Sequence, residues 1–252
     1  MKWCNRLLII PVALTLYAQQ AQREAPNTTP DVEPEAMAAL KSMGAYLRSL
    51  RAFEVRAQVT TEDVLTDGQK VTIGSSTNLL ARMPDRLRVE TDDDWKERLY
   101  LYNGKTFTLY ARRLNYYATV PAAATITDLA NNLEDKYDIE IPLVDLFRWG
   151  GPRSAESEIT GATDIGPGVV DGTTCEHYAF RQPGLDWQLW IQQGDFPLPR
   201  KLILTTLTDE ARPQHASIFT WNLAPSFNDA AFDFNPPQNA QKIVFAAAGG
   251  PK

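Results

Sequence analysis

Alternation of apolar and polar residues is the dominant pattern in this chain. It runs through residues 53–121 and returns in residues 173–223, where apolar side chains occupy every second position over long stretches. A period of two is typical of β-strands with one buried face. Asp67-Gly68 and Asn103-Gly104 separate neighbouring segments, and such pairs favour tight hairpin turns. The pattern therefore predicts a meander of about ten antiparallel strands.

Three segments have helical spacing instead. Residues 34–50 carry an apolar side chain at every third or fourth position, which predicts an amphipathic helix with Pro34 in its first turn. Thr127 is the expected N-cap of a short helix over residues 128–137, and residues 142–151 predict a second short helix. We expect an α+β fold, in which these helices cover one side of a single curved antiparallel sheet.

The first residues have the features of a secretory signal. Lys2 and Arg6 accompany the apolar run Leu7–Tyr17, and the small residues Ala18 and Ala21 mark a cleavage region. The run is too short to cross a hydrocarbon layer of about 30 Å comfortably, although a retained anchor is the alternative. We expect a signal peptide over residues 1–21, a flexible polar leader over 22–33 and one domain over 34–252. The mature form is expected to have no integral membrane span.

Charge and cysteine content limit the function classes. The chain has 25 basic and 31 acidic side chains, for a net charge of −6, and it contains no basic block. This balance argues against nucleic acid as a partner. Signal cleavage removes Cys4 and leaves Cys175, so neither an internal disulfide nor a thiolate zinc site is expected.

Catalytic and metal-binding motifs are absent from the sequence, and no cofactor is expected. His177 and His215 lie in separate predicted strands and are interpreted as surface or edge-strand imidazoles. Cys175 shares a strand face with His177, which leaves an enzymatic nucleophile and base as an alternative, but no third group orients this pair. The acidic run 92–94 is interpreted as a solvated hairpin turn, and the acidic residues within 134–140 as the wet side of a short helix.

The segment DWQLWIQQ places a tryptophan on each face of a strand. Trp187, Leu189 and Ile191 share one face, whereas Trp190 lies on the other. The concave face of the predicted sheet is either filled by helix side chains or partly filled around a cavity. Most apolar faces are simply cores, so the local pattern favours the filled face, and a partly filled face with a cavity is the alternative.

Seven motifs follow one another along the chain: RMPDRLRVE, LYNGKTFTLY, NYYATVPAAATITDL, IPLVDLFRWG, CEHYAFRQPGLDWQLWI, PLPRKLILTT and FDFNPPQNAQKI. In this order they resemble those of a bacterial family of predicted periplasmic proteins that carry a domain of unknown function. That family is similar to the outer-membrane lipoprotein carriers of the LolA, LolB and LppX-like superfamily. The resemblance implies a periplasmic location and an unclosed, half β-barrel with helices packed on its concave face around a cavity for acyl chains.

The expected function is a periplasmic binding or carrier protein for lipid or for the acyl chains of a lipoprotein. An envelope sensor or assembly factor that binds a protein partner through the same fold is the alternative, and both are non-enzymatic. The expected cavity wall consists of Val55, Ala57, Val59, Leu87, Val89, Leu99, Leu101, Phe107, Leu109 and Trp187. The expected lid consists of Leu129, Leu133, Leu143, Leu146 and Phe147.

Overall fold

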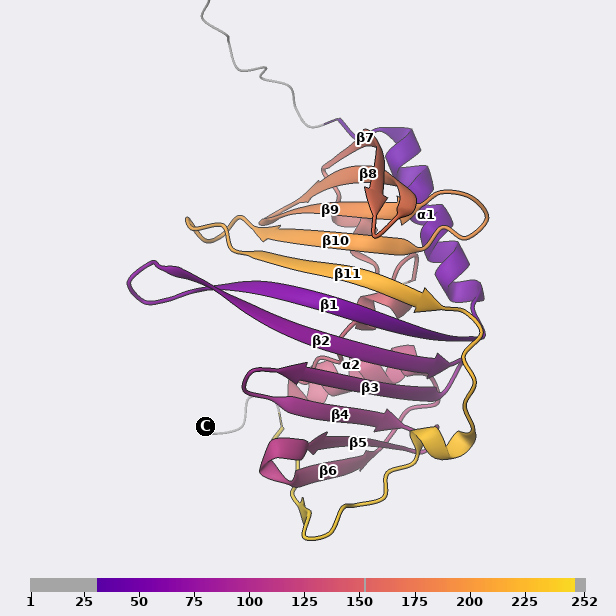
Figure 1. Ribbon diagram of the computed structural model, residues 1–252, viewed down its shortest axis with the longest axis vertical. Coiled ribbons are helices and arrows are strands. Elements are labelled where there is room, and N and C mark those ends of the chain that lie inside the picture. The colour runs from indigo at the N-terminus through magenta and orange to yellow at the C-terminus, as the bar shows by residue number, and fades with distance from the viewer. Residues whose placement is uncertain (1–30, 152, 248–252) are drawn as a thin grey trace, which may run out of the picture.

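The computed structural model describes residues 31–151 and 153–247, which form a single twelve-stranded sheet with helices on one side (Figure 1). The strand order is β12-β6-β5-β4-β3-β2-β1-β11-β10-β9-β8-β7, so β12 and β7 are the two edges and the sheet does not close. The predicted fold, an unclosed antiparallel sheet with helices on the concave face, is confirmed. The one exception to antiparallel pairing among the named strands is the short parallel contact between β12 and β6.

Two meanders make up the sheet. The first contains β1 (Ala52–Val64), β2 (Lys70–Arg82), β3 (Arg86–Asp93), β4 (Glu97–Tyr102), β5 (Thr106–Ala111) and β6 (Tyr116–Pro121). The second contains β7 (Gly161–Val170), β8 (Thr173–Gln182), β9 (Leu185–Gln192), β10 (Pro199–Thr206) and β11 (Gln214–Asn222), and the edge strand β12 is Gln241–Lys242. The first and last long strands join the two halves, with Glu54 opposite Asn222 and Thr61 opposite His215.

Helices lie behind the sheet in the view of Figure 1, with α1 (Pro34–Ser49) behind the half that holds β7–β11 and α2 (Ile126–Tyr137) behind the other half. Short 3₁₀ helices complete the connections: η1 (Arg112–Leu114), η2 (Val144–Phe147), η3 (Ala155–Glu158) and η4 (Asp229–Phe232). The helix of residues 34–50 is confirmed, since α1 begins at Pro34 with proline in its first turn.

The predicted cap of α2 is wrong by two residues. Thr125, not Thr127, is the N-cap, and its side chain accepts a hydrogen bond from the Asp128 backbone N–H. Asp138 ends α2 in the left-handed conformation. The second short helix forms only as the 3₁₀ turn η2, which begins after Leu143 in the left-handed conformation.

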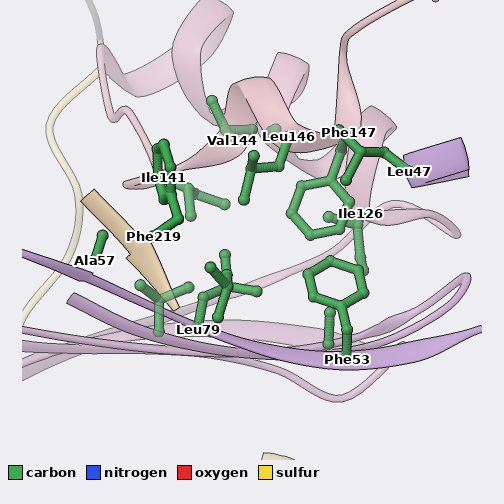
Figure 2. Close-up of a cluster of buried hydrophobic side chains, with 14 of the residues drawn as sticks. Leu47, Phe53, Ala57, Leu79, Ile126, Ile141, Val144, Leu146, Phe147 and Phe219 are labelled. Atoms are coloured by element: carbon green, nitrogen blue, oxygen red, sulfur yellow. The ribbon is translucent and has the colours of Figure 1, made fainter. Parts of the chain in front are cut away.

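The core lies between the concave face and the helices. Figure 2 shows strand residues such as Phe53 and Leu79 pointing up at Ile126 of α2 and Phe147 of η2. The rings of Phe53 and Phe147 are 5.8 Å apart, and Phe53 also contacts Trp221 of β11. Burial of these large side chains is the main favourable term for the association of helices and sheet.

The predicted signal peptide, 1–21, and most of the predicted leader, 22–33, lie outside the described residues. In the part of the chain that the structure describes, none of the helices has both the length and the apolar character needed to cross a membrane.

Candidate functional site

Most of the predicted wall residues point to the concave face. They belong to one buried apolar cluster together with side chains of α1, α2 and η2. Leu109 is half-buried and packs against the same cluster. The wall residues found in the cluster are Val55, Ala57, Val59, Leu87, Val89, Phe107 and Trp187.

Leu99 and Leu101 are the exceptions, because they lie on the opposite, convex face. They form a separate cluster with Tyr110, covered by Phe234 of the C-terminal segment. The register explains the difference: Leu101 lies opposite Arg88 and Leu99 opposite Glu90, so both leucines share the face of a charged pair. The tyrosines of β4 take the concave positions instead. The expectation that Leu99 and Leu101 line the concave wall is therefore wrong.

The predicted lid residues lie over the concave face as expected. Leu129 and Leu133 on α2, and Leu146 and Phe147 on η2, are buried in the main cluster. Leu143 is half-buried and has φ = 63°, a left-handed conformation that is unfavourable for a leucine. Whether these residues act as a lid stays a prediction.

Side chains of the buried cluster fill one part of the concave face, and another part is hollow. A cavity of ≈ 510 Å³ lies between the segment 140–149 and strands β1–β4, β10 and β11. Its apolar wall consists of Val59, Leu143, Leu146, Trp149, Leu202 and Phe219, among others. We call it the central cavity. The local pattern favoured a filled concave face, and the structure has the alternative, a partly filled face with a cavity.

Two further hollows adjoin the central cavity. The first, of ≈ 320 Å³, lies toward β9 and shares Asp145, Trp149, Leu202 and Leu204 with it; we call it the inner cavity. The second, of ≈ 590 Å³, lies toward β5 and includes Leu109. It shares Arg98, Tyr100, Glu140 and Pro142 with the central cavity. We call these three adjoining hollows, which extend over the concave face from Leu109 on β5 to Trp187 on β9, the groove.

The floor of the central cavity carries polar groups that sequence reasoning missed. His215 bonds through Nδ1 to the Thr61 hydroxyl, at 2.9 Å, and through Nε2 to the Ser217 hydroxyl, at 3.3 Å. Burial lowers the pKa of His215, which favours the neutral imidazole. The interpretation of His215 as a surface or edge-strand residue is wrong, since β11 lies in the middle of the sheet. The alternation of His215, Ser217 and Phe219 in the sequence was the available signal.

Two acids line the other side of the central cavity. Burial raises the pKa of Glu140, and the neighbouring charges of Asp145 and Glu134 raise it further. Burial also raises the pKa of Asp145, against the opposing effect of Arg148. The Asp145 side chain still has 65% of its surface accessible, because it projects into a cavity whose walls surround it. Glu140 lies beyond the end of α2, so it does not belong to the wet side of that helix.

The segment that covers the cavities is attached to α1. Arg48 donates a hydrogen bond from Nη1 to the carbonyl of Trp149. Glu156 accepts a hydrogen bond from the backbone N–H of Gly150 at 2.8 Å. Arg148 pairs with Glu134 of α2. Polar contacts at a few points thus hold Trp149, which lines both the central and the inner cavity.

The two tryptophans of the β9 strand have different surroundings, as the alternation predicted. Trp187 is buried and stacks on Phe180 in the concave cluster. Trp190 is half-buried on the other face, where it stacks on His177 with ring centroids 3.8 Å apart and lies under the Lys201 ammonium. His177 is thus engaged on the convex face, away from the three cavities.

The other candidate chemical groups have structural surroundings. Asp93 accepts hydrogen bonds from the backbone N–H groups of Trp95 and Lys96, which makes the acidic run a hairpin turn as predicted. Cys175 is 0% exposed, and burial raises the pKa of its thiol. Among residues 31–151 and 153–247, no cluster of three or more His, Cys, Asp or Glu could hold a metal ion.

Several solved structures are similar in fold at low identity. LprF from Mycobacterium bovis has 14% identity and a TM-score of 0.49, over 84% of this chain and 100% of LprF. The lipoprotein LppX from Mycobacterium tuberculosis has 12% identity and a TM-score of 0.45, over 78% and 100% of the two chains. A LolA superfamily protein from Nitrosomonas europaea has 9% identity and a TM-score of 0.35, over 79% and 97%.

The comparison with protein families is decisive for identity. None of the curated proteins matches this chain in sequence. Residues 36–246, essentially the whole described domain, match the family model described as "Predicted periplasmic protein (DUF2092)". This match confirms the predicted family and the predicted periplasmic location. The chain belongs to the DUF2092 family of predicted periplasmic proteins.

Proposed function

We propose that the protein is a periplasmic carrier that binds lipid, or the acyl chains of a lipoprotein, in the groove on its concave face. The observation that carries the proposal is the central cavity, whose inner wall is made by Leu146, Trp149, Leu202 and Phe219. A volume of ≈ 510 Å³ lies within the range of about 300–1,000 Å³ that is usual for small-molecule sites.

Burial of acyl chains supplies the binding energy in this proposal. Each methylene that moves from water into an apolar cavity contributes about 0.8 kcal/mol. The groove continues from the central cavity toward β5 and toward β9, so an extended chain has room on both sides. No covalent bond is needed for tight retention.

The polar floor suits an amphiphile better than a pure hydrocarbon. His215, Thr61 and Ser217 already satisfy one another by hydrogen bonds, so an apolar chain can lie over them at little cost. The lining of the central cavity also includes Asp93, Lys96 and Arg98, so polar as well as apolar groups of a ligand find partners there. The proposal therefore places the acyl chains along the apolar wall and the polar group of the amphiphile beside polar side chains of the groove.

Release of the ligand requires the covering segment to move. Residues 138–149 contain only the 3₁₀ turn η2 and include Leu143 in a strained conformation. Such strained, short elements often mark segments that change conformation. We expect opening around residues 138–143, with Trp149 released from Arg48.

A binding function fits the chemistry of the site better than an enzymatic one. The raised pKa of Cys175 disfavours the thiolate that a nucleophilic mechanism needs. Cys175 and His177 also lie on β8 away from the cavities, which these two residues do not line. The proposal assigns no chemical step to the protein.

The test compares two tryptophan substitutions on adjacent residues of β10. Leu204 lines the central and inner cavities, whereas Ile203 points to the opposite face. Each protein is purified from the periplasm without detergent and analysed by native mass spectrometry, followed by organic extraction. We expect a stoichiometric lipid adduct on the wild type and on Ile203→Trp, and its loss on Leu204→Trp because the larger ring fills the groove.

Two results would contradict the proposal. One is an adduct that survives unchanged on Leu204→Trp. The other is a wild-type protein without adduct that also fails to bind an apolar fluorescent probe, which would favour the alternative of an envelope protein as the partner.

A further inference from the structure

The inner cavity collects buried polar atoms that have no hydrogen-bond partner. Among the described residues, four buried side-chain nitrogen or oxygen atoms lack one, and three of these belong to residues that line this cavity. They are Trp187 Nε1, Arg148 Nε and Ser154 Oγ. A buried polar group without a partner is costly, so three beside one hollow favour a complementary ligand group there. The three atoms are closed to a water-sized probe as the chain stands, so such a group reaches them only when neighbouring side chains shift.

Trp187 is the most sharply defined of the three. It is only 7% exposed, and it lies on β9 between Phe180 and Leu204 of the neighbouring strands. Its ring stacks on Phe180 at 4.1 Å, with 19° between the planes, so the indole is held in one orientation. An indole N–H can only donate a hydrogen bond. The group that it selects must be an acceptor.

Charge in the inner cavity is already balanced. Arg148, whose side chain is 14% exposed, pairs with Glu134 and lies 3.8 Å from Asp145. Arg153 pairs with Asp135 at 2.9 Å. The lining also includes Asp145 and Glu156. An anionic group would meet these acids without a free cation to neutralise it, so an uncharged acceptor is favoured.

We propose that the inner cavity binds the carbonyl oxygen of an uncharged acyl ester or amide, with Trp187 Nε1 as its main donor. The proposal rests on the proposed function and names the chemical class of its ligand. The carbonyl oxygen accepts from Trp187, with Arg148 Nε and Ser154 Oγ as further partners. The acyl chain then passes Leu202 and Leu204, which both cavities share, into the central cavity.

A matched pair of probes isolates the carbonyl group. 1-Monomyristoylglycerol carries an ester, and 1-O-tetradecylglycerol has the same head group and nearly the same chain with an ether in its place. Affinities are measured by displacement of an apolar fluorescent probe from the delipidated full chain. We expect the ester to bind about 10-fold more tightly than the ether, which corresponds to about 1.4 kcal/mol for one buried hydrogen bond.

Two variants test the donor. Trp187→Phe keeps an aromatic ring against Phe180 and removes Nε1, and we expect its affinities for the ester and the ether to become equal. Trp190→Phe alters the other tryptophan of β9, on the convex face, and should keep the preference. Circular dichroism verifies that both variants are folded.

Each remaining outcome has one meaning. If both probes bind equally to the wild type and Leu204→Trp blocks both, the carbonyl site is wrong and the carrier function stands. If neither probe binds, the carrier function fails and this proposal fails with it. If myristate binds more tightly than the ester, and Trp187→Phe removes that advantage, the cavity selects a carboxylate and the uncharged class is wrong.

Discussion

Thr125 determines where α2 begins through two reciprocal hydrogen bonds. Its hydroxyl oxygen accepts from the Asp128 backbone N–H at 3.1 Å and donates to the Asp128 carboxylate at 2.8 Å. Thr127 offers the same chemistry two residues later. Ile126 distinguishes them, because a helix that starts after Thr125 turns Ile126 into the core, where it is fully buried.

We predict that Thr125→Ala lowers the free energy of unfolding by about 1 kcal/mol, the usual cost of a lost N-cap. Thr127→Ala is the matched control and should change stability by less than about 0.5 kcal/mol. Urea unfolding followed by circular dichroism measures both. An equal loss for the two variants would mean that the cap does not select the start of the helix.

At the scale of elements, two glycines allow α1 to approach the covering segment closely. A Cβ on Gly44 would lie 3.2 Å from the carbonyl oxygen of Trp149. Gly150 has φ = 70°, and a Cβ there would overlap the guanidinium of Arg48. The hydrogen bond from Arg48 to Trp149 depends on this close approach. The helix therefore positions the segment that covers the inner cavity.

We predict that Gly44→Leu lowers the free energy of unfolding by about 1–3 kcal/mol, because the side chain has no room against residues 149–150. Ala45 is exposed on the same helix, so Ala45→Leu should be within about 0.5 kcal/mol of the wild type. The same urea titration is suitable. A stable Gly44→Leu protein would show that α1 and the covering segment separate freely.

At the scale of the whole molecule, the C-terminal segment wraps around the β6 edge of the sheet. Phe234 packs on Tyr110 and Tyr117 of the convex face, at 5.5 and 5.0 Å. β12 then pairs with β6, and Phe245 reaches the concave side to contact Phe107 and Tyr137. Figure 1 shows this segment descending from β11 to the β6 edge. It covers backbone groups that an exposed edge strand would offer to other chains.

We predict that a chain ending at Asn239 loses about 1–3 kcal/mol of stability, mainly through the partly buried Phe245 ring, and aggregates faster on heating. A chain ending at Ala247 keeps β12 and Phe245 and is the control. Thermal unfolding with light scattering measures both effects. Unchanged stability and scattering in the shorter chain would show that β12 does not protect the edge.

The alternation of apolar and polar residues was sufficient to predict much of the sheet and part of the candidate site. Trp187, Leu189 and Ile191 occupy every second position of β9, which was sufficient to predict that they share one buried face. The orientation of β4 was ambiguous, because ERLYLY has apolar side chains on both faces of the strand. Pairing with Arg88 and Glu90 of β3 places Leu99 and Leu101 on the convex face. That pairing was available as a signal in the sequence of β3.

Short-range sequence therefore determined most of the strands, the hairpin turns, α1 and the family to which the chain belongs. It did not predict β7 or β12, which lie outside the alternating segments. Pairing of β1 with β11, the cavities and the unpartnered atoms around Trp187 depend on residues far apart in the chain. Side-chain volumes alone do not say whether the segment 140–149 reaches the floor formed by His215 and Ser217. The distance between this segment and the floor depends on the curvature of the sheet and on the hydrogen bond that anchors Trp149 to α1. Only the folded chain establishes both.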